Sequence, residues 1–266
     1  MLEINLMYVL MINYKIVLHI KSIIISFLFL IIPSLAFAQI GAYRNDLALG
    51  INSGYMLTNV GFTPKVTQKM KPGFTGGLSF RYTSEKYFKT LCSLYAELNY
   101  SQMGWSENIV TLKSEPVMNT ATGQAEKYDR RMTYFQLPVM AHLSWGKEER
   151  GFSFFFQAGP QFGYLLSEST STNFTKENAN VAERANQTIE QYDMPVKNKL
   201  DYGICAGLGL EYSNPAIGHL LLEGRYYYGL ANIYGSSKRD YFAKSNQSAL
   251  EFKLSYLIDI THFKSK

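Results

Sequence analysis

Residues 201–232 read DYGICAGLGLEYSNPAIGHLLLEGRYYYGLAN, and this stretch decides the fold. From Tyr202 to Tyr212 the even positions are apolar and end in tyrosines, whereas the odd positions are small or charged. A strict period of two predicts a β-strand whose two faces meet different surroundings. After a turn over residues 213–218 the alternation resumes as far as Leu230, which predicts a second strand and hence a hairpin.

The spacing of the tyrosines in this hairpin suits a membrane. Tyr202 and Tyr212 are ten residues apart, which corresponds to about 33 Å along an extended strand. A strand tilted by about 40° then spans roughly 25 Å, the height of the apolar band of an outer-membrane barrel with its aromatic borders. A soluble β-sandwich or a lipocalin-like barrel would show the same local pattern, with the apolar face turned toward a core. The rest of the chain has to separate these interpretations.

Residues 1–38 have the features of a secretory signal peptide. Lysines precede the apolar run Ile23–Ile32, and Ala36-Phe37-Ala38 forms an A-x-A cleavage site. The alternative is a membrane anchor, but the uncharged run is about half of the ~20 residues that a spanning helix needs. We therefore expect cleavage after Ala38 and a mature chain, residues 39–266, that forms one domain.

Strand-like runs alternate with turns along this mature chain. Eight runs show an apolar face: 46–57, 73–83, 88–105, 130–145, 152–166, the two runs of the hairpin, and 248–260. Their connections alternate between short (84–87, 146–151, 213–218) and long (58–72, 106–129, 167–197, 233–247).

Such sorting of loops is typical of an outer-membrane barrel, which has short periplasmic turns and long external loops. An even number of strands also closes a sheet without a free edge. We therefore predict an all-β fold, namely a closed antiparallel up-and-down transmembrane β-barrel of eight strands in the bacterial outer membrane, in contact with its lipid. A hairpin within residues 167–197 would raise the number to ten, and Ala182–Tyr192 is a candidate short helix.

Prolines and cysteines add local expectations. Pro138 and Pro160 lie inside predicted strands, where proline removes a hydrogen bond of the ladder, so we expect bulges or local loss of pairing there. Cys92 shares a face with apolar residues, whereas Cys205 lies on the small or polar face of its strand. The two thiols are therefore expected on opposite sides of the wall, where they cannot bridge.

Several short motifs follow one another along the mature chain: AELNYSQMG (96–104), YFQLP (134–138), AGP (158–160) with GY (163–164), DYG (201–203) with GLG (207–209), and EGRYYYGLAN (223–232). This ordered set resembles the PorT-like outer-membrane β-barrel proteins of the Bacteroidetes. The resemblance covers most of the mature chain and implies an envelope location and a link with type IX protein secretion. Gln136 departs from the family, which usually has an acidic residue there.

Residues with catalytic or metal-binding spacing are not apparent. No predicted surface loop contains a histidine, because His142, His219 and His262 all map to the periplasmic end. A histidine-dependent hydrolase needs its general base beside the substrate, so this class is disfavoured. We predict a non-enzymatic protein without cofactor or metal. Lysines and arginines are scattered among the loops, which gives no reason to expect a nucleic-acid partner.

Charged residues on the predicted inward faces form the one notable constellation. An eight-stranded barrel is just wide enough for side chains to fill it, so such charges must pair or be hydrated. The simpler interpretation is a structural salt-bridge network that plugs the lumen. If the last three strands are consecutive neighbours, Glu211, Arg225 and Glu251 could share one cluster. The residues are Arg81, Glu97, Asp201, Glu211, Glu223, Arg225, Glu251 and Lys253.

Two functions remain open from the sequence. In the first, the barrel has a structural or protein-interaction role, and its long loops or its periplasmic face bind a secretion or envelope protein. In the second, the lumen is a narrow channel or a binding site for a small solute. The sequence gives no indication of the oligomeric state.

Overall fold

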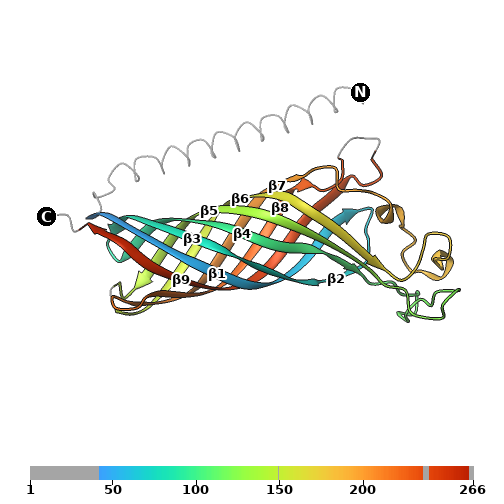
Figure 1. Ribbon diagram of the computed structural model, residues 1–266, viewed down its shortest axis with the longest axis horizontal. Coiled ribbons are helices and arrows are strands. Elements are labelled where there is room, and N and C mark those ends of the chain that lie inside the picture. Colours follow the sequence, from blue (N-terminus) through green and yellow to red (C-terminus); the bar gives the residue numbers. More distant parts are fainter. Residues whose placement is uncertain (1–41, 149, 236–239, 264–266) are drawn as a thin grey trace, which may run out of the picture. The chain divides into compact units, whose positions relative to one another are not determined.

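The computed structural model describes residues 42–148, 150–235 and 240–263. Figure 1 shows long, strongly tilted strands that lie side by side around a common axis, with the long connections gathered at one end. Among the described residues, no helix has the length and apolar character needed to cross a membrane. The predicted signal peptide lies outside the described residues.

Eight long strands correspond in order to the eight predicted runs, and a two-residue strand, β2, is added in the first long connection. The predicted short helix is replaced by two separate 3₁₀ turns. The elements are β1 (Ala42–Thr63), β2 (Gln68–Lys69), β3 (Lys71–Tyr87), β4 (Thr90–Glu107), β5 (Tyr128–Gly146), β6 (Gly151–Thr172), η1 (Val181–Glu183), η2 (Glu190–Tyr192), β7 (Leu200–Asn214), β8 (Gly218–Asn232) and β9 (Lys244–Phe263).

The eight long strands form a ring. Each pairs with its neighbours in the order β1-β3-β4-β5-β6-β7-β8-β9, and β9 pairs in turn with β1, from Thr63↔Lys244 to Asn45↔Phe263. Every pairing is antiparallel. The all-β, antiparallel, up-and-down arrangement predicted from the sequence is thereby confirmed.

The two faces of the strands differ as the period of two predicts. On β7, Ile204 is 56% exposed on the outside of the ring, whereas its neighbour Cys205 is fully buried inside. Leu208 and Leu210 continue the exposed face. Cys92 is partly buried, shares the parity of the outward residues of β4, and is a free thiol, as is Cys205. The outside of the ring is therefore an apolar surface, and the inside is largely polar.

Both prolines coincide with breaks in pairing. Between β4 and β5 the ladder stops at Ala96↔Val139 and resumes at Asn99↔Gln136, beside Pro138. Between β5 and β6 it stops at Pro138↔Gln161 and resumes at Ala141↔Ala158, beside Pro160. The register is unchanged across both gaps. The expected local loss of pairing is confirmed, and neither site contains a bulge.

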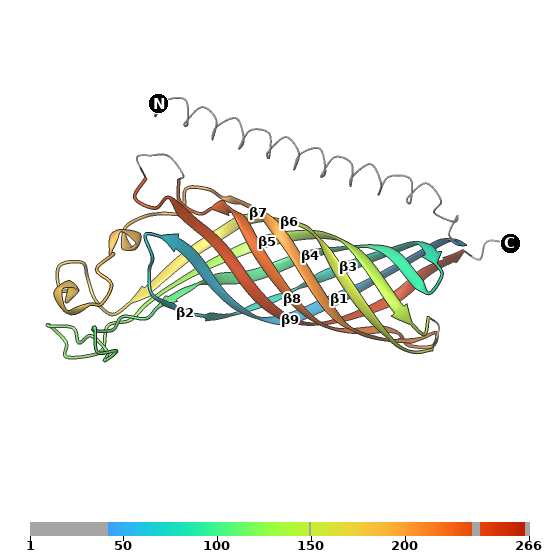
Figure 2. The same cartoon turned by 180° about the vertical axis from the view of Figure 1, so that it is seen from behind.

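Short and long connections lie at opposite ends of the ring. The short ones, described at residues 88–89, 147–148 and 215–217, lie at the same end as the start of β1 and the end of β9 (Figure 2). The long ones are described at residues 64–70, 108–127, 173–199, 233–235 and 240–243. The gold segment 173–199 and the green segment 108–127 fold beyond the other end of the strands.

Candidate functional site

All eight predicted inward charges lie inside the ring, and none is more than 7% exposed. They fall into three groups at different heights. The central cluster consists of Glu97, Glu223, Arg225, Glu251 and Lys253. The short-turn cluster contains Arg81 and Glu211, and Asp201 lies apart from both.

Arg225 organises the central cluster. Its guanidinium donates two hydrogen bonds to Glu97, with Nη1–Oε2 and Nη2–Oε1 distances of 2.8 and 2.9 Å. It also donates from Nε to Glu223 Oε1 at 2.8 Å. Lys253 Nζ donates to Glu97 Oε2 at 2.5 Å, and Glu251 faces Arg225 in the β8–β9 ladder. Bidentate, charge-assisted bonds of this kind are among the stronger polar interactions in proteins.

These ion pairs cross the whole ring. Arg225 lies on β8 and Glu97 on β4, four places apart in a ring of eight, and so on opposite walls. Arg81 on β3 and Glu211 on β7 are also four places apart, and their side chains meet at 2.6 Å between Nη1 and Oε1. Side chains from facing walls are therefore in direct contact at two heights.

Glu211 does not share a cluster with Arg225, so this expectation is wrong. In the β7–β8 ladder Arg225 lies opposite Gly207, whereas Glu211 lies opposite Leu221. Four residues along a strand correspond to about 13 Å. The carboxylate of Glu211 is therefore nearer the short connections, where it meets Arg81 and His219.

Next to the short-turn cluster, Ser213, His219 and Asp259 have the composition of a hydrolase triad. Ser213 Oγ lies 2.9 Å from His219 Nδ1, and Asp259 Oδ2 lies 2.8 Å from Nε2 of the same ring. Glu211 Oε1, however, lies 2.7 Å from that Nδ1. An imidazolium that donates to a carboxylate on each side satisfies this geometry and cannot accept the proton of Ser213. The set is an ion-pair group and not a nucleophilic centre.

Gln157 and His142 lie between the two clusters, and His142 Nε2 is 3.9 Å from Glu211 Oε2. Gln157 Nε2 donates to Glu223 Oε1 at 2.5 Å, and Gln157 Oε1 lies 3.1 Å from His142 Nδ1. The buried His142 ring stacks between Tyr95 and Phe155, with centroid distances of 5.7 and 4.8 Å. Polar contacts and aromatic packing therefore fill the space between the central and short-turn clusters.

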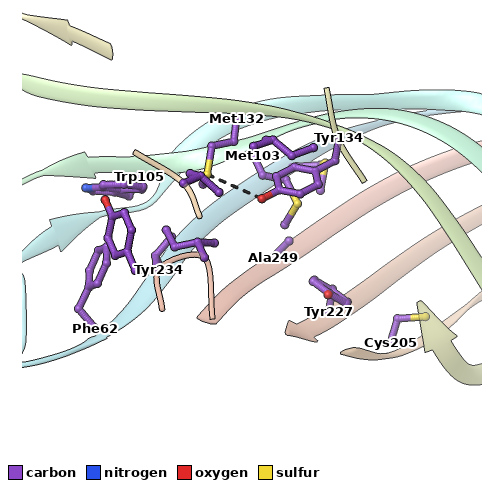
Figure 3. Packing of buried hydrophobic residues seen from close by; sticks show 14 of the residues in the cluster. Phe62, Met103, Trp105, Met132, Tyr134, Cys205, Tyr227, Tyr234 and Ala249 are labelled. Atoms are coloured by element: carbon purple, nitrogen blue, oxygen red, sulfur yellow. Dashed lines mark hydrogen bonds between the residues drawn. The ribbon is translucent and has the colours of Figure 1, made fainter. Parts of the chain in front are cut away.

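Aromatic side chains fill the ring toward its long-loop end. Figure 3 shows Phe62, Trp105 and Tyr234 together there, with Met103, Met132 and Tyr134 next along the interior. The Phe62 ring lies 5.2 Å from that of Trp105 and 6.1 Å from that of Tyr234, measured between centroids. This part of the interior is aromatic, and the buried guanidinium of Arg130 lies over the rings of Trp105 and Tyr234, 5.6 and 5.9 Å from their centroids.

Residues 108–127 and 173–199, which we call the loop lid, are joined by a buried ion pair. Arg184 donates from Nη2 and Nε to Glu126 Oε2 at 2.6 and 3.1 Å, and both side chains are almost fully buried. Its guanidinium also lies over the rings of Phe174 and Tyr192, 4.9 and 5.5 Å from their centroids. Cation–π contacts of this kind strengthen when they are desolvated.

The loop lid crosses the mouth of the ring. On one side, Gln191 and Tyr192 donate to Glu107 at the end of β4, at 2.8 and 2.7 Å. On the other side, the backbone N–H of Lys197 donates to the carbonyl of Ile233, just after β8, at 3.0 Å. Strands β4 and β8 lie on opposite walls. Burial and the neighbouring Glu107 carboxylate raise the pKa of Tyr192 above its ordinary value, which keeps its hydroxyl proton in place.

Arg130 ties the loop lid to the inside of β5. It donates from Nη1 to the carbonyls of Met194 and Gln191 at 2.7 and 3.2 Å, and from Nη2 to Glu168 Oε2 at 2.6 Å. Arg184 and Glu126 were not predicted, because loop segments lack the periodicity that identified the inward charges. Arg130 has the inward parity of Tyr134 and Gln136 but stands at the first position of its predicted strand, and it was not included among the inward charges. No signal in the sequence pairs Arg184 with a carboxylate 58 residues away.

A comparison with protein families identifies the family of the chain. A family model described as "Outer membrane protein beta-barrel domain" matches residues 37–235. None of the curated proteins matches the chain.

Among solved structures, the chain is similar to Ail, the attachment invasion locus protein of Yersinia pestis, at 11% identity and a TM-score of 0.33, covering 83% of this chain and 100% of that one. It is also similar to OprG of Pseudomonas aeruginosa (12%, TM-score 0.36, 83% and 98% covered) and to Neisserial surface protein A (9%, TM-score 0.36, 79% and 96% covered). At these identities and TM-scores the likenesses carry no argument.

Proposed function

Because this chain belongs to the outer membrane protein beta-barrel domain family and is located in the outer membrane, we propose that it acts there as a closed, eight-stranded transmembrane barrel with a structural or protein-interaction role. In this proposal the protein is not an enzyme. The short connections face the periplasm, and the loop lid lies outside the cell, as is usual for such barrels.

One observation carries the proposal, namely the direct ion pairs between opposite walls of the ring. Arg225 meets Glu97 and Arg81 meets Glu211 across the full width, and Gln157 and His142 occupy the space between the two levels. A solute channel needs a continuous hydrated path, and these contacts occupy its cross-section. The eight inward charges accordingly act as a structural network that plugs the lumen and holds the walls at a set distance.

The loop lid is the proposed interaction surface. Loops that merely connect strands have no need of a buried ion pair, since removing an arginine and a glutamate from water is costly. Here Arg184 and Glu126 fix residues 108–127 and 173–199 against each other. A surface held in one conformation binds a partner protein with little further loss of conformational entropy.

Type IX secretion is the process that the PorT resemblance supports for this role. The test is a deletion strain whose secreted and surface proteins are compared with those of its parent. Loss of type IX cargo, with precursors accumulating in the periplasm and recovery on complementation, is the expected result. An unchanged profile would remove the secretion link and leave the structural role.

The alternative of a narrow solute channel has a separate test. Purified protein reconstituted into liposomes is expected to give no more flux of small sugars, amino acids or ions than protein-free liposomes. Flux that rises with the amount of protein would show that the lumen is open and would overturn the sealed barrel.

Leu208→Arg tests the membrane-facing surface. Leu208 is 56% exposed near the middle of the outward face of β7. An arginine at the middle of the bilayer costs about 2–4 kcal/mol. We expect the free energy of unfolding to fall by this amount. Urea unfolding from phospholipid vesicles measures it, with the folded and unfolded fractions read from their different mobilities on unheated gels. The matched control is Leu112→Arg at a loop tip, where Leu112 is 89% exposed, and its cost should stay within about 0.5 kcal/mol. Equal costs at both positions would contradict a lipid-facing β7.

A further inference from the structure

The outer end of β6 extends beyond the strand that follows it. The β6–β7 ladder ends at Tyr164↔Leu200, whereas the β5–β6 ladder continues to Tyr128↔Thr172. Residues 167–172 therefore pair with β5 along one edge only, and we call their other edge the β6 edge. In Figure 1 this end of β6, in yellow, points toward the long connections. All six residues are exposed, so another molecule can reach them.

Three residues direct their backbone groups to the β6 edge. Glu168, Thr170 and Thr172 have the inward parity, because their ladder partners on β5 are buried inside the ring. Leu165 is also inward, and its N–H donates to the carbonyl of Lys199, on the β7 side, at 2.7 Å. Residues of one strand whose side chains lie on the same face point their N–H and C=O groups to the same side. The three residues therefore present donors and acceptors to the β6 edge.

The described part of the chain leaves these backbone groups without a strand partner. Beyond Leu165, no backbone hydrogen bond joins the β6 edge to any residue that the structure describes. One contact reaches a side chain instead, where the N–H of Val196 lies 3.4 Å from Glu168 Oε2. That carboxylate also pairs with Arg130 at 2.6 Å. The edge is therefore open along its length.

Other strand ends at the long-loop end have covered edges. The side-chain amide of Gln68 forms hydrogen bonds with both the N–H and the C=O of Val60 on β1, at 3.1 and 2.7 Å. Strand β2 pairs with the end of β4, and the N–H groups of Lys197 and Asn198 donate to the carbonyl of Ile233, just after β8. Edges that must stay unpaired usually carry lysine or proline. The β6 edge has neither, so nothing in its sequence opposes a further strand.

A second copy of this chain does not suit the β6 edge within one membrane. Both copies would direct β6 outward, so the two strands would run parallel, and a half-turn about the membrane normal would bring the same edge of each together. Adjacent parallel strands are joined through opposite edges, because only then do their side chains share the same two faces. The occupant has to be a segment that can run antiparallel to β6, as β7 does.

We infer that the β6 edge binds an extended, uncharged segment of another protein, which joins the sheet as a strand in line with β7. In such β-augmentation the backbone hydrogen bonds supply the affinity. Five of the six residues are serine or threonine, and the one charge, on Glu168, already pairs with Arg130. Threonine and β-branched side chains pair well across strands with such residues, so a segment rich in threonine and valine fits best.

This inference rests on the proposed function, because it names the kind of partner for the interaction role and needs the end of β6 to lie outside the cell. The β6 edge ends at Thr172, where the loop lid begins. A partner strand bound there would lie beside the loop lid.

The first test measures binding of the labelled peptide KTVTVTVTK to the full mature protein, held as one copy per lipid nanodisc. Saturable binding is expected. Only one edge of the peptide strand can face β6, so two further peptides carry N-methyl groups on all valines or on all threonines. One of the two should bind at least about tenfold more weakly than the parent peptide, because its donors to the β6 edge are blocked. No binding, or equal binding of all three peptides, overturns the proposal.

Thr170→Pro locates the binding site. Proline removes an N–H that points to the β6 edge and leaves the hydrogen bonds to β5 in place, so the peptide should bind roughly tenfold more weakly or not at all. The matched control is Thr170→Val, which keeps the N–H and the shape of the side chain and should keep the affinity. Heat-dependent gel mobility checks that both variants are folded. Full affinity in Thr170→Pro overturns the β6 edge as the site.

Hydrogen exchange in the unaltered protein gives a second measurement if Thr170→Pro does not fold. Bound peptide should slow exchange at the amides of Glu168, Thr170 and Thr172 by at least about tenfold. Unchanged exchange at these amides overturns the proposal. These measurements use purified protein, so their failure leaves the secretion test untouched, and an unchanged secreted profile leaves the β6 edge standing.

Discussion

Replacing Arg225 with methionine is expected to lower the free energy of unfolding by about 3–5 kcal/mol. The change removes every hydrogen bond from β8 to Glu97 and leaves Glu223 with Gln157 as its donor. Glu97 keeps Lys253, but the buried Glu223 loses its ion pair with Arg225, and an uncompensated buried charge is far more costly than a lost contact. Urea unfolding from vesicles, followed by gel mobility, measures the loss.

Two comparisons make this prediction specific. Arg131→Met removes an arginine from the exposed face of β5 and should cost less than about 1 kcal/mol. Adding Glu223→Gln to Arg225→Met should recover part of the stability, because the carboxylate that has lost its ion pair with Arg225 is then neutral, whereas Glu97 keeps Lys253. A loss below about 1 kcal/mol for Arg225→Met, or no recovery in the double variant, would contradict a central cluster held by Arg225.

Arg184→Met is expected to release the loop lid while the ring stays folded. Glu126, fully buried beside Arg184, would have to move into water or stay unpaired, at a local cost of about 3–5 kcal/mol. A local opening of this size raises the exposure of backbone amides in proportion to the opening equilibrium. Hydrogen exchange in residues 108–127 and 173–199 should therefore accelerate by roughly 100-fold or more.

The control is a lysine in the same segment. Lys176→Met breaks an exposed ion pair with Asp193, and pairs of this kind contribute about 0–1 kcal/mol. Exchange should change little, and heat-dependent gel mobility should be the same for both variants and the wild type. Unchanged exchange in Arg184→Met, or loss of the folded gel band, would show that the loop lid and the ring are not separate units of stability.

The period of two predicted the faces of the strands well because each position meets one of only two environments. Along β7, for example, a step of one residue leads from the exposed Ile204 to the buried Cys205. The boundaries were predicted less well. β6 continues to Thr172, six residues beyond its predicted end at Leu166, because the ladder extends past the apolar outer surface into polar residues. Apolar alternation therefore reports the surface of the ring and not the length of its strands.

Heights and distances across the ring could not be obtained from the same pattern. Periodicity identifies an inward position but not the stagger of one strand against the next. Glu211 was grouped with Arg225 for that reason, although the ladder places it about 13 Å nearer the short connections. The pairing of Arg225 with Glu97 depends on which strands face each other, a property of the closed ring. The loop lid has no periodicity at all, so Arg184 and Glu126 could not be recognised as partners.

The ion pairs between opposite walls also have a consequence for assembly. Glu97 and Arg225 are 128 residues apart and come within reach only when all intervening strands have joined the ring. Slipping one strand by two residues keeps every side chain on its proper face but shifts it by about 6–7 Å along the wall, which breaks the contact. A misaligned ring would thus keep its apolar outer surface but lose the ion pair between Arg225 and Glu97. The ion pairs therefore stabilise only the ring whose strands are in the correct register, and they form only when the ring has closed.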